Sequence, residues 1–287
     1  MGVRPALRRL ATEEGGFTLT ELLVTMASAI VVTAALFAIQ QVAMFESNRV
    51  FARVDATQEA RVTMANLANR LQSSCVADGV NPIQQNSTAT SMRFISKHGS
   101  AASLTPELHV ISMVSDPPGF DLVDATHPQT GGTAPNWTFA ATPSSTRTMV
   151  EGVTQDGSTP VFQYFAYGVA RNSSGSAYLD TAGNPYVMLL DGTSSLPSGV
   201  TTSSGGSVPP GTIPANSPSP LPTSGTGLSA ANAEIASAVR VTMLVSPSGK
   251  MASNQNYDEA TSFSNTFSLR LTPPLSDRNP QLVVPCA

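Results

Sequence analysis

The stretch that decides the fold of this 287-residue chain is GGFTLTELLVTMASAIVVTAALFAI, residues 15–39. From Phe17 to Ile39 the sequence is apolar over 23 residues and carries one charge, that of Glu21. A helix of that length rises roughly 34 Å, which is enough to cross a hydrocarbon core about 30 Å thick. The stretch therefore predicts a membrane-spanning helix near the N-terminus.

The charges around this segment predict its orientation. Arg4, Arg8 and Arg9 precede it, and no comparable basic cluster follows closely. Because basic residues stay on the cytoplasmic side of a span, we expect residue 1 in the cytoplasm and the rest of the chain outside it. The expected location is thus that of a single-pass membrane protein with an extracytoplasmic head.

Two simpler interpretations of the N-terminus explain less. A secretory signal peptide has a shorter apolar region, of about 7–15 residues, and a cleavage site after it. Here Glu13 and Glu14 also lie where basic residues should meet the apolar run. A plain membrane anchor leaves Glu21 and the preceding Gly-Gly pair unexplained. Because an unpaired carboxylate at membrane depth costs a few kcal/mol, Glu21 is a candidate functional residue.

The residues around the Gly-Gly pair carry a specific resemblance. Gly15-Gly16-Phe17-Thr18-Leu19-Thr20-Glu21-Leu22-Leu23 resembles the prepilin cleavage and methylation motif of the type IV pilin superfamily. That superfamily includes the pseudopilins of type II secretion and of competence. The resemblance implies that residues 1–16 are a leader, that a membrane prepilin peptidase cleaves between Gly16 and Phe17, and that the new amino group of Phe17 is methylated.

Elementary chemistry is consistent with that implication. Glycine at the cleavage site lets the backbone lie extended in a peptidase without a side-chain clash. Cleavage would leave an amine near the membrane surface, and Glu21 would be a candidate partner for the Phe17 amine of a neighbouring subunit. The alternative for Glu21 is a carboxylate that reaches the nearby membrane face without a partner.

The helix is expected to continue beyond the membrane. No proline or glycine occurs between Phe17 and Asp78, so we predict a transmembrane and assembly segment at 17–45 and an amphipathic continuation at 46–76. Its apolar stripe comprises Val50, Val54, Ala60, Met64, Leu67, Ala68 and Leu71. Cys75 follows on the same stripe and should face the head. There Cys286 could form a disulfide with it, closing a loop of about 210 residues.

Alternating apolar segments predict strands in the remaining residues, 77–287. They are 92–95, 108–114, 161–169, 186–191, 235–245 and 263–271. Strands without intervening helices favour an antiparallel sheet with one face on the helix, which gives an α+β, pilin-like fold. Residues 192–233 are rich in Ser, Thr, Gly and Pro and almost uncharged, so we expect a mobile loop there that buries no core.

The order of these elements is similar to that of the W-type minor pilins and the J-type pseudopilins of type II secretion. By that resemblance the chain is a structural subunit that enters or primes a pilus-like filament. Its partners would be prepilin peptidase, other pilin subunits through the N-terminal helix, membrane lipid and an assembly platform. An alternative is a filament-tip adhesin or a DNA-contacting module of a competence or surface-attachment system.

The sequence does not indicate an enzyme. Its three histidines, His98, His109 and His127, match no metal-ligand spacing, so we expect no metal and no cofactor. Asp121 and Asp124 lack the spacing of a calcium loop and are expected in a solvated loop. The net charge of −4, with 12% charged residues, provides no basic stripe for nucleic acid.

Overall fold

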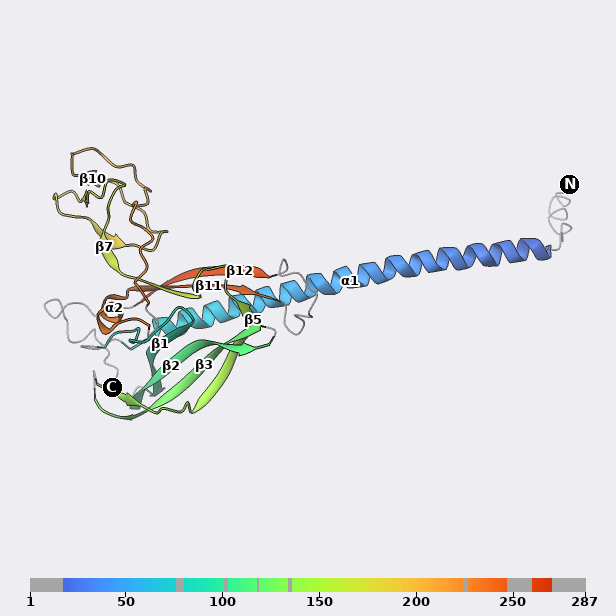
Figure 1. The fold of residues 1–287 in the computed structure, drawn as a ribbon, viewed down its shortest axis with the longest axis horizontal. Coiled ribbons are helices and arrows are strands. Elements are labelled where there is room, and N and C mark those ends of the chain that lie inside the picture. Colours follow the sequence, from blue (N-terminus) through green and yellow to red (C-terminus); the bar gives the residue numbers. More distant parts are fainter. Residues whose placement is uncertain are drawn as a thin grey trace, which may run out of the picture. The chain divides into compact units, whose positions relative to one another are not determined.

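The computed structural model describes residues 18–75, 80–100, 103–117, 119–133, 136–223, 227–246 and 260–269 (Figure 1). The chain divides into two compact units, with the boundary between Phe51 and Ala52. The predictions on Gly15, Gly16, Phe17 and Cys286 lie outside the described residues. Those residues otherwise include most of the predicted helix and all of the predicted strands except the last residues of 263–271.

The first element is the predicted long helix, α1 (Leu19–Gln72, 54 residues). Thr18 caps its N-terminus, because the Glu21 backbone N–H donates to Thr18 Oγ1 at 3.3 Å. The helix ends four residues before the expected end at residue 76. It ends because Ser74 pairs with Ser96 as an isolated antiparallel bridge and the Cys75 N–H donates to the Ile95 carbonyl at 2.8 Å. The chain thus passes directly from the helix into sheet pairing.

The second unit is built on an eight-stranded antiparallel sheet with the order β1-β2-β3-β5-β11-β12, to which β4 adds through β3 and β6 through β11. Its strands are β1 (Ser91–Ser100), β2 (Ser103–Asp116), β3 (Gly119–Gly131), β4 (Thr138–Phe139), β5 (Ser145–Thr154), β6 (Phe162–Phe165), β11 (Ala238–Val245) and β12 (Thr261–Ser268). All pairings among them are antiparallel. The α+β class predicted from the sequence is confirmed.

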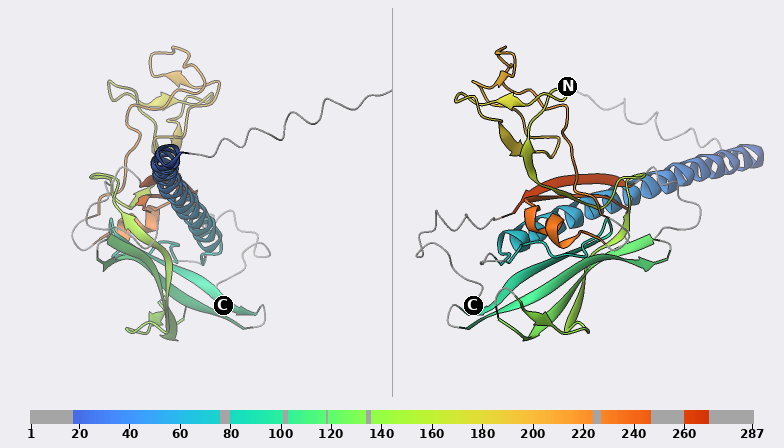
Figure 2. Two further views of the ribbon diagram at one scale, coloured as in Figure 1. Left: turned by 90° about the vertical axis from the view of Figure 1, so that its right-hand side faces the viewer. Right: turned by 60° about the vertical axis from the view of Figure 1, so that its left-hand side comes forward.

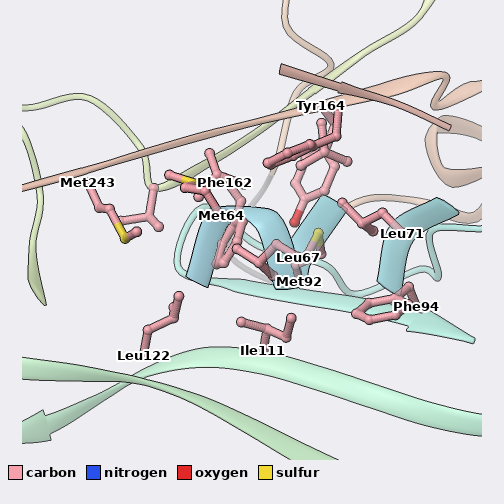
Figure 3. Packing of buried hydrophobic residues seen from close by; sticks show 14 of the residues in the cluster. Met64, Leu67, Leu71, Met92, Phe94, Ile111, Leu122, Phe162, Tyr164 and Met243 are labelled. Atoms are coloured by element: carbon pink, nitrogen blue, oxygen red, sulfur yellow. The ribbon is translucent and has the colours of Figure 1, made fainter. Parts of the chain in front are cut away.

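The sheet curves around the 52–72 part of α1. Strands β11 and β12 lie on one side of it and β2 and β3 on the other (Figure 2). The core between them contains Leu67 and Leu71, both fully buried. Figure 3 shows Phe162 and Tyr164 on one side of the helix and Ile111 on the opposite side. One face of the sheet therefore closes on the helix, as the strand pattern predicted.

The buried stripe of α1 is shorter than predicted. It comprises Ala56, Ala60, Thr63, Met64, Leu67 and Leu71. Val50 and Val54 remain 57% and 48% exposed, so their assignment to the stripe is wrong for the isolated chain. The reason is tertiary: the buried face begins at Ala56, and the hydrophobic period alone does not show where a helix first meets its sheet.

Several elements were not predicted, among them the long strands β3 and β5 and the helix α2. Strands β3 and β5 carry polar side chains on both faces, and Asp124 in β3 is buried rather than in a solvated loop, so that prediction is wrong. The strand predicted at 235–245 begins only at Ala238, because Ala230–Ile235 forms the short helix α2. Ser229 caps α2 by accepting from the Asn232 backbone N–H.

Residues 166–219, which we call the small lobe, contain two further two-stranded sheets. Strand β7 (Tyr167–Val169) pairs with β9 (Val187–Leu189), and β8 (Tyr178–Leu179) pairs with β10 (Thr201–Thr202). An antiparallel bridge between Phe165 and Pro220 closes the base of the lobe. The lobe has its own core of Ala170, Tyr178, Met188, Leu190, Leu196, Val200 and Val208.

The prediction that residues 192–233 bury no core is therefore wrong. Leu196 and Val200 are buried in the lobe, and Leu228 is buried in the main core, where its backbone also bonds to Ser87 and Asn86. The composition of the segment is a poor guide because four of the seven residues in the core of the lobe lie outside it. Tyr178 and Met188 supply the large apolar surfaces against which these few aliphatic residues pack.

Candidate functional site

The N-terminal turn of α1 contains Glu21, the residue singled out in the sequence. Its backbone N–H is bonded to Thr18, but its carboxylate has no hydrogen-bond or ion-pair partner in the part of the chain that the structure describes. The positive end of the helix dipole favours a carboxylate at this position. Helix capping thus accounts for the Thr18–Glu21 spacing and leaves the carboxylate available to another group.

The helix surface that follows Glu21 is apolar and exposed along the first unit. Large side chains such as Phe37 and Ile39 are more than 60% exposed, and none of the apolar window is buried within the chain. Among the described helices, α1 is the one long and apolar enough to cross a membrane. The finding is consistent with a single-pass membrane protein.

Of the predicted cleavage and assembly residues, the structure describes Glu21. Glu21 lies in the first turn of α1, whereas Gly15, Gly16 and Phe17 lie outside the described residues. Cleavage after Gly16, and the pairing of Glu21 with a Phe17 amine, stay predictions. The described residues bring none of the predicted site residues into contact with another.

Cys75 lies three residues beyond α1 and is fully buried. It packs in a second apolar cluster with Val80, Ile95 and Leu108. Its position facing the sheet agrees with the helical spacing from which the prediction was made. Because Cys286 lies outside the described residues, the disulfide between the two stays a prediction.

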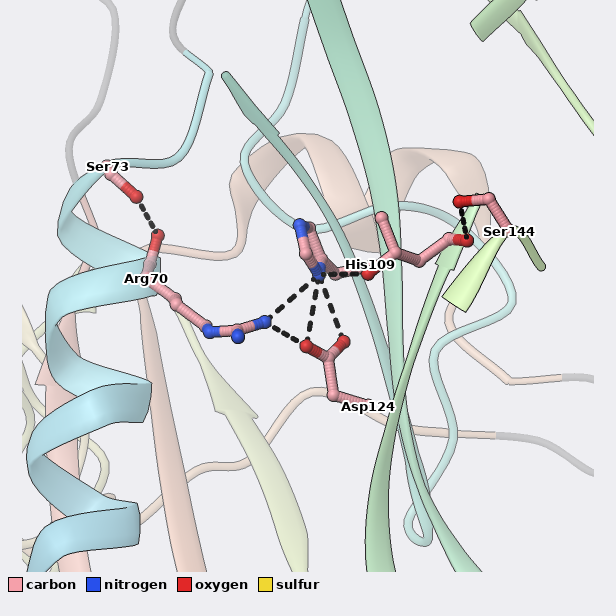
Figure 4. A network of polar contacts seen from close by, with 6 residues as sticks. Arg70, Ser73, His109, Asp124 and Ser144 are labelled. Atoms are coloured by element: carbon pink, nitrogen blue, oxygen red, sulfur yellow. Dashed lines mark hydrogen bonds and ion pairs between the residues drawn. The ribbon is translucent and has the colours of Figure 1, made fainter. Parts of the chain in front are cut away.

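A buried polar cluster joins the last turns of α1 to the sheet (Figure 4). Asp124 on β3, 2% exposed, forms an ion pair with the Arg70 guanidinium and lies 3.0 Å, through Oδ1, from Nδ1 of His109 on β2. The His109 ring stacks on Phe94 of β1 with the ring centroids 5.2 Å apart. Residues of α1 and β2 therefore contact the carboxylate on β3, and Phe94 of β1 packs against the histidine.

This cluster stabilises the contact between α1 and the sheet. Arg70 and His109 both present donors to Asp124, and a carboxylate can accept several hydrogen bonds. Removing one partner of a buried ion pair leaves a desolvated charge, which costs about 3–5 kcal/mol. The burial of Arg70 and the charge of nearby Arg147 lower the pKa of its guanidinium, so the contact with Asp124 also offsets a local excess of positive charge.

Sequence reasoning missed this cluster, although one signal was present. Asp124 lies two residues after Leu122, so in a strand both side chains face the same way. Leu122 is fully buried, which places Asp124 on the inner face of β3. A strand assigned at residues 119–131 predicts that the Asp124 carboxylate is buried and needs a cationic partner.

Within the described part of the chain, no group of three His, Cys, Asp or Glu side chains is placed to hold a metal ion. The carboxylate of Asp124 is occupied by its contacts with Arg70 and His109.

Comparison with protein-family models, with curated proteins and with solved structures finds no match. The structure itself shows a long N-terminal apolar helix whose second part packs on an antiparallel sheet, a pilin-like arrangement.

Proposed function

We propose that this protein is a structural subunit of a type IV pilus-like filament, made as a prepilin and cleaved after Gly16. The observation that carries the proposal is Glu21, a carboxylate without a partner in the described chain, placed five residues into an apolar segment and at the start of a helix. A membrane anchor needs no such residue, and its desolvation would oppose insertion.

The proposed mechanism is helix packing with a charge-based register. Cleavage would create an amine at Phe17, and the Glu21 carboxylate of a neighbouring subunit would neutralise it as the apolar helices pack together. The charge pair is favourable only when both partners are present and desolvated together, so it would admit one axial register among many. Membrane lipid would cover the same helix surface before assembly, and an assembly platform would move the subunit from one environment to the other.

Within this class, we assign the chain to minor pilins of the W type or to J-type pseudopilins. Supporting features are the strands of the second unit, a helix–sheet core, and a head enlarged by the small lobe. A subunit with so large a head suits a priming position or the end of a filament, where fewer neighbours surround it, better than repetition along its length.

The cleavage is tested by intact-mass measurement of the protein extracted from membranes of cells that contain prepilin peptidase. We expect a mass that lacks residues 1–16 and includes one added methyl group. The same measurement in cells without the peptidase should return the uncleaved chain. An uncleaved N-terminus in both strains would refute the prepilin assignment.

The role of Glu21 is tested by Glu21→Ala. The variant should remain in the membrane but be lost from sheared filaments, because the helix stays apolar while the register pair is removed. Glu21→Asp keeps the charge and should retain part of the incorporation. Glu46→Ala is the matched control, since Glu46 is an exposed glutamate on the same helix whose nearest cation is Arg49, at 4.0 Å. Normal incorporation of Glu21→Ala would exclude the assembly role.

A filament-tip binding module is the second candidate, and the small lobe favours it. The lobe is a folded body with its own core rather than a loose insertion, and Ser, Thr, Gly and Pro dominate residues 192–219. The Phe165–Pro220 bridge brings its two ends together, so residues 166–219 can be replaced by a short Gly-Ser linker. Loss of surface attachment with intact filaments would support a binding role, whereas unchanged attachment would exclude it.

A further inference from the structure

A groove with charged ends runs between α1 and strand β5 in the second unit. Its cavity of about 290 Å³ is lined by one face of the helix, including Asp55, Glu59, Asn66 and Arg70, and by β5 residues such as Arg147. The hydrogen bond from Thr63 Oγ1 to the Met149 carbonyl, 2.8 Å long, holds the two walls together. The groove is therefore part of the folded unit rather than a gap beside it.

One end of the groove is acidic. Burial raises the pKa of Glu59, and the neighbouring carboxylates of Glu151, Asp55 and Asp121 raise it further. The backbone N–H of Glu151 partly offsets this effect. None of these four carboxylates has an ion-pair partner in the described part of the chain. This end thus gathers negative charge that the chain itself does not neutralise.

The other end of the groove is basic. Arg70 lines it while its guanidinium contacts Asp124, which neutralises one positive charge. Arg147 adds a second guanidinium that is close enough to lower the pKa of Arg70. Arg147 is exposed, and its guanidinium makes no hydrogen bond or ion pair among the described residues. One positive charge therefore faces the groove without a partner.

The two ends do not neutralise each other. Glu59 and Arg70 are eleven residues apart on α1, about 16 Å along the helix axis at 1.5 Å per residue. At physiological ionic strength, charges interact weakly beyond the screening length of about 8 Å. Each end is consequently available to an opposite charge supplied from outside.

We propose that the groove binds an extended segment of another protein that places a Lys or Arg against Asp55 and Glu59 and an Asp or Glu against Arg147. An extended chain rises about 3.3 Å per residue, so the two charged residues of that segment should be about five positions apart. A cavity of about 290 Å³ holds a few side chains and excludes a whole helix. The inference does not rest on the proposed function, because it depends on the groove and its charges alone.

The test is photo-crosslinking with the full-length protein in its own cells. Asn66, between the two ends of the groove, is replaced by p-benzoylphenylalanine. Ala65 is the matched control position, since it is exposed but does not line the groove. We expect the Asn66 position alone to crosslink to a second polypeptide. Mass spectrometry of the crosslinked peptide should find a basic and an acidic residue about five positions apart.

Charge reversal then tests whether the crosslink depends on the two ends. Arg147→Glu and Asp55→Arg should each lower the crosslink yield about tenfold, because each places like charges together. Reversing the partner residue identified opposite Arg147 should restore it. Both positions are exposed, and unchanged thermal unfolding would show that the variants fold.

Three results would overturn the inference. They are no crosslink from Asn66, a crosslink only to lipid or to a second copy of this chain, and a yield that the folded charge-reversal variants do not change. Cleavage after Gly16 is read from intact mass in the same cells, so failure of the groove proposal and failure of the prepilin proposal are separate outcomes.

Discussion

The two halves of helix α1 differ in whether their apolar side chains are exposed or buried. Residues 19–51 expose apolar side chains along the described segment, whereas residues 52–72 bury one stripe against the sheet. Both halves are helical because neither contains proline or glycine. The comparison shows that helix formation and burial have different causes. Local sequence determines where the helix forms, and neighbouring elements determine whether its apolar side chains are buried. The first half leaves its apolar surface exposed within the chain, and the second half buries its stripe against its own sheet.

The largest effect on stability is expected at the ion pair that joins the second half of α1 to the sheet. Asp124→Ala should lower the free energy of unfolding by about 3–5 kcal/mol, because Arg70 would keep a partly buried charge without its partner. Urea unfolding of the full chain in detergent measures it through Trp137, the sole tryptophan, which packs partly buried near Cys75. Asp116→Ala, at an exposed aspartate, should have little effect. Equal stability of the two variants would contradict a stabilising role of the Asp124 ion pair.

A pair of leucines compares the two halves directly. Leu67→Ala, at a fully buried position, should destabilise the second unit by about 2–5 kcal/mol through the lost apolar contact and the cavity left behind. Leu36→Ala, at a position 62% exposed in the first unit, should leave the same Trp137 unfolding curve unchanged. A similar loss in both variants would mean that the halves are not independent in stability.

The N-terminal cap allows a smaller and more local change. Thr18→Ala removes the acceptor of the Glu21 N–H and should cost about 1 kcal/mol at the helix end. Hydrogen exchange should speed up at the first amides of α1 and stay unchanged in the sheet. Thr18→Ser keeps the hydroxyl and should preserve the protection. An unaltered exchange pattern in Thr18→Ala would show that the cap is dispensable.

The smallest effect concerns Glu59 on the second half. Because its pKa is raised in the folded state, the folded protein holds this proton more tightly than the unfolded chain. The stability contributed by that protonation is present below the ordinary value of 4.5 and is lost as the pH rises above it. Glu59→Gln should therefore be slightly more stable than the wild type at neutral pH and equal to it in acid. The reverse order in pH-dependent urea unfolding would contradict the assignment.

The sequence alone predicted the parts of this fold that depend on local pattern. The absence of helix breakers predicted α1, and the 3.6-residue period identified Ala60, Met64, Leu67 and Leu71 as buried. Val50 and Val54 fit the same period but lie beyond the reach of the sheet in the isolated chain. Their exposure depends on the length and curvature of other elements, which periodicity does not contain.

The Asp124 cluster shows what local pattern cannot supply. Its partners, Arg70 and His109, are 54 and 15 residues away in the sequence and meet only through helix docking and strand register. The small lobe is similar, because its core combines aliphatic residues of a polar segment with Tyr178 and Met188 from an earlier one. Glu21 could be proposed from sequence because its signal, a carboxylate within an apolar run, is entirely local.

The passage of the chain from α1 into the sheet has a mechanical consequence. The buried stripe from Ala56 to Leu71 extends about 22 Å along the helix axis. A pulling force on the helix from its N-terminal side, directed along that axis, would load these contacts in shear, all at once, rather than peel them one by one. The Ser74–Ser96 bridge and the Cys75–Ile95 hydrogen bond lie beyond the far end of the stripe, so they would bear load last. The second unit is therefore built to stay attached under tension along its own helix.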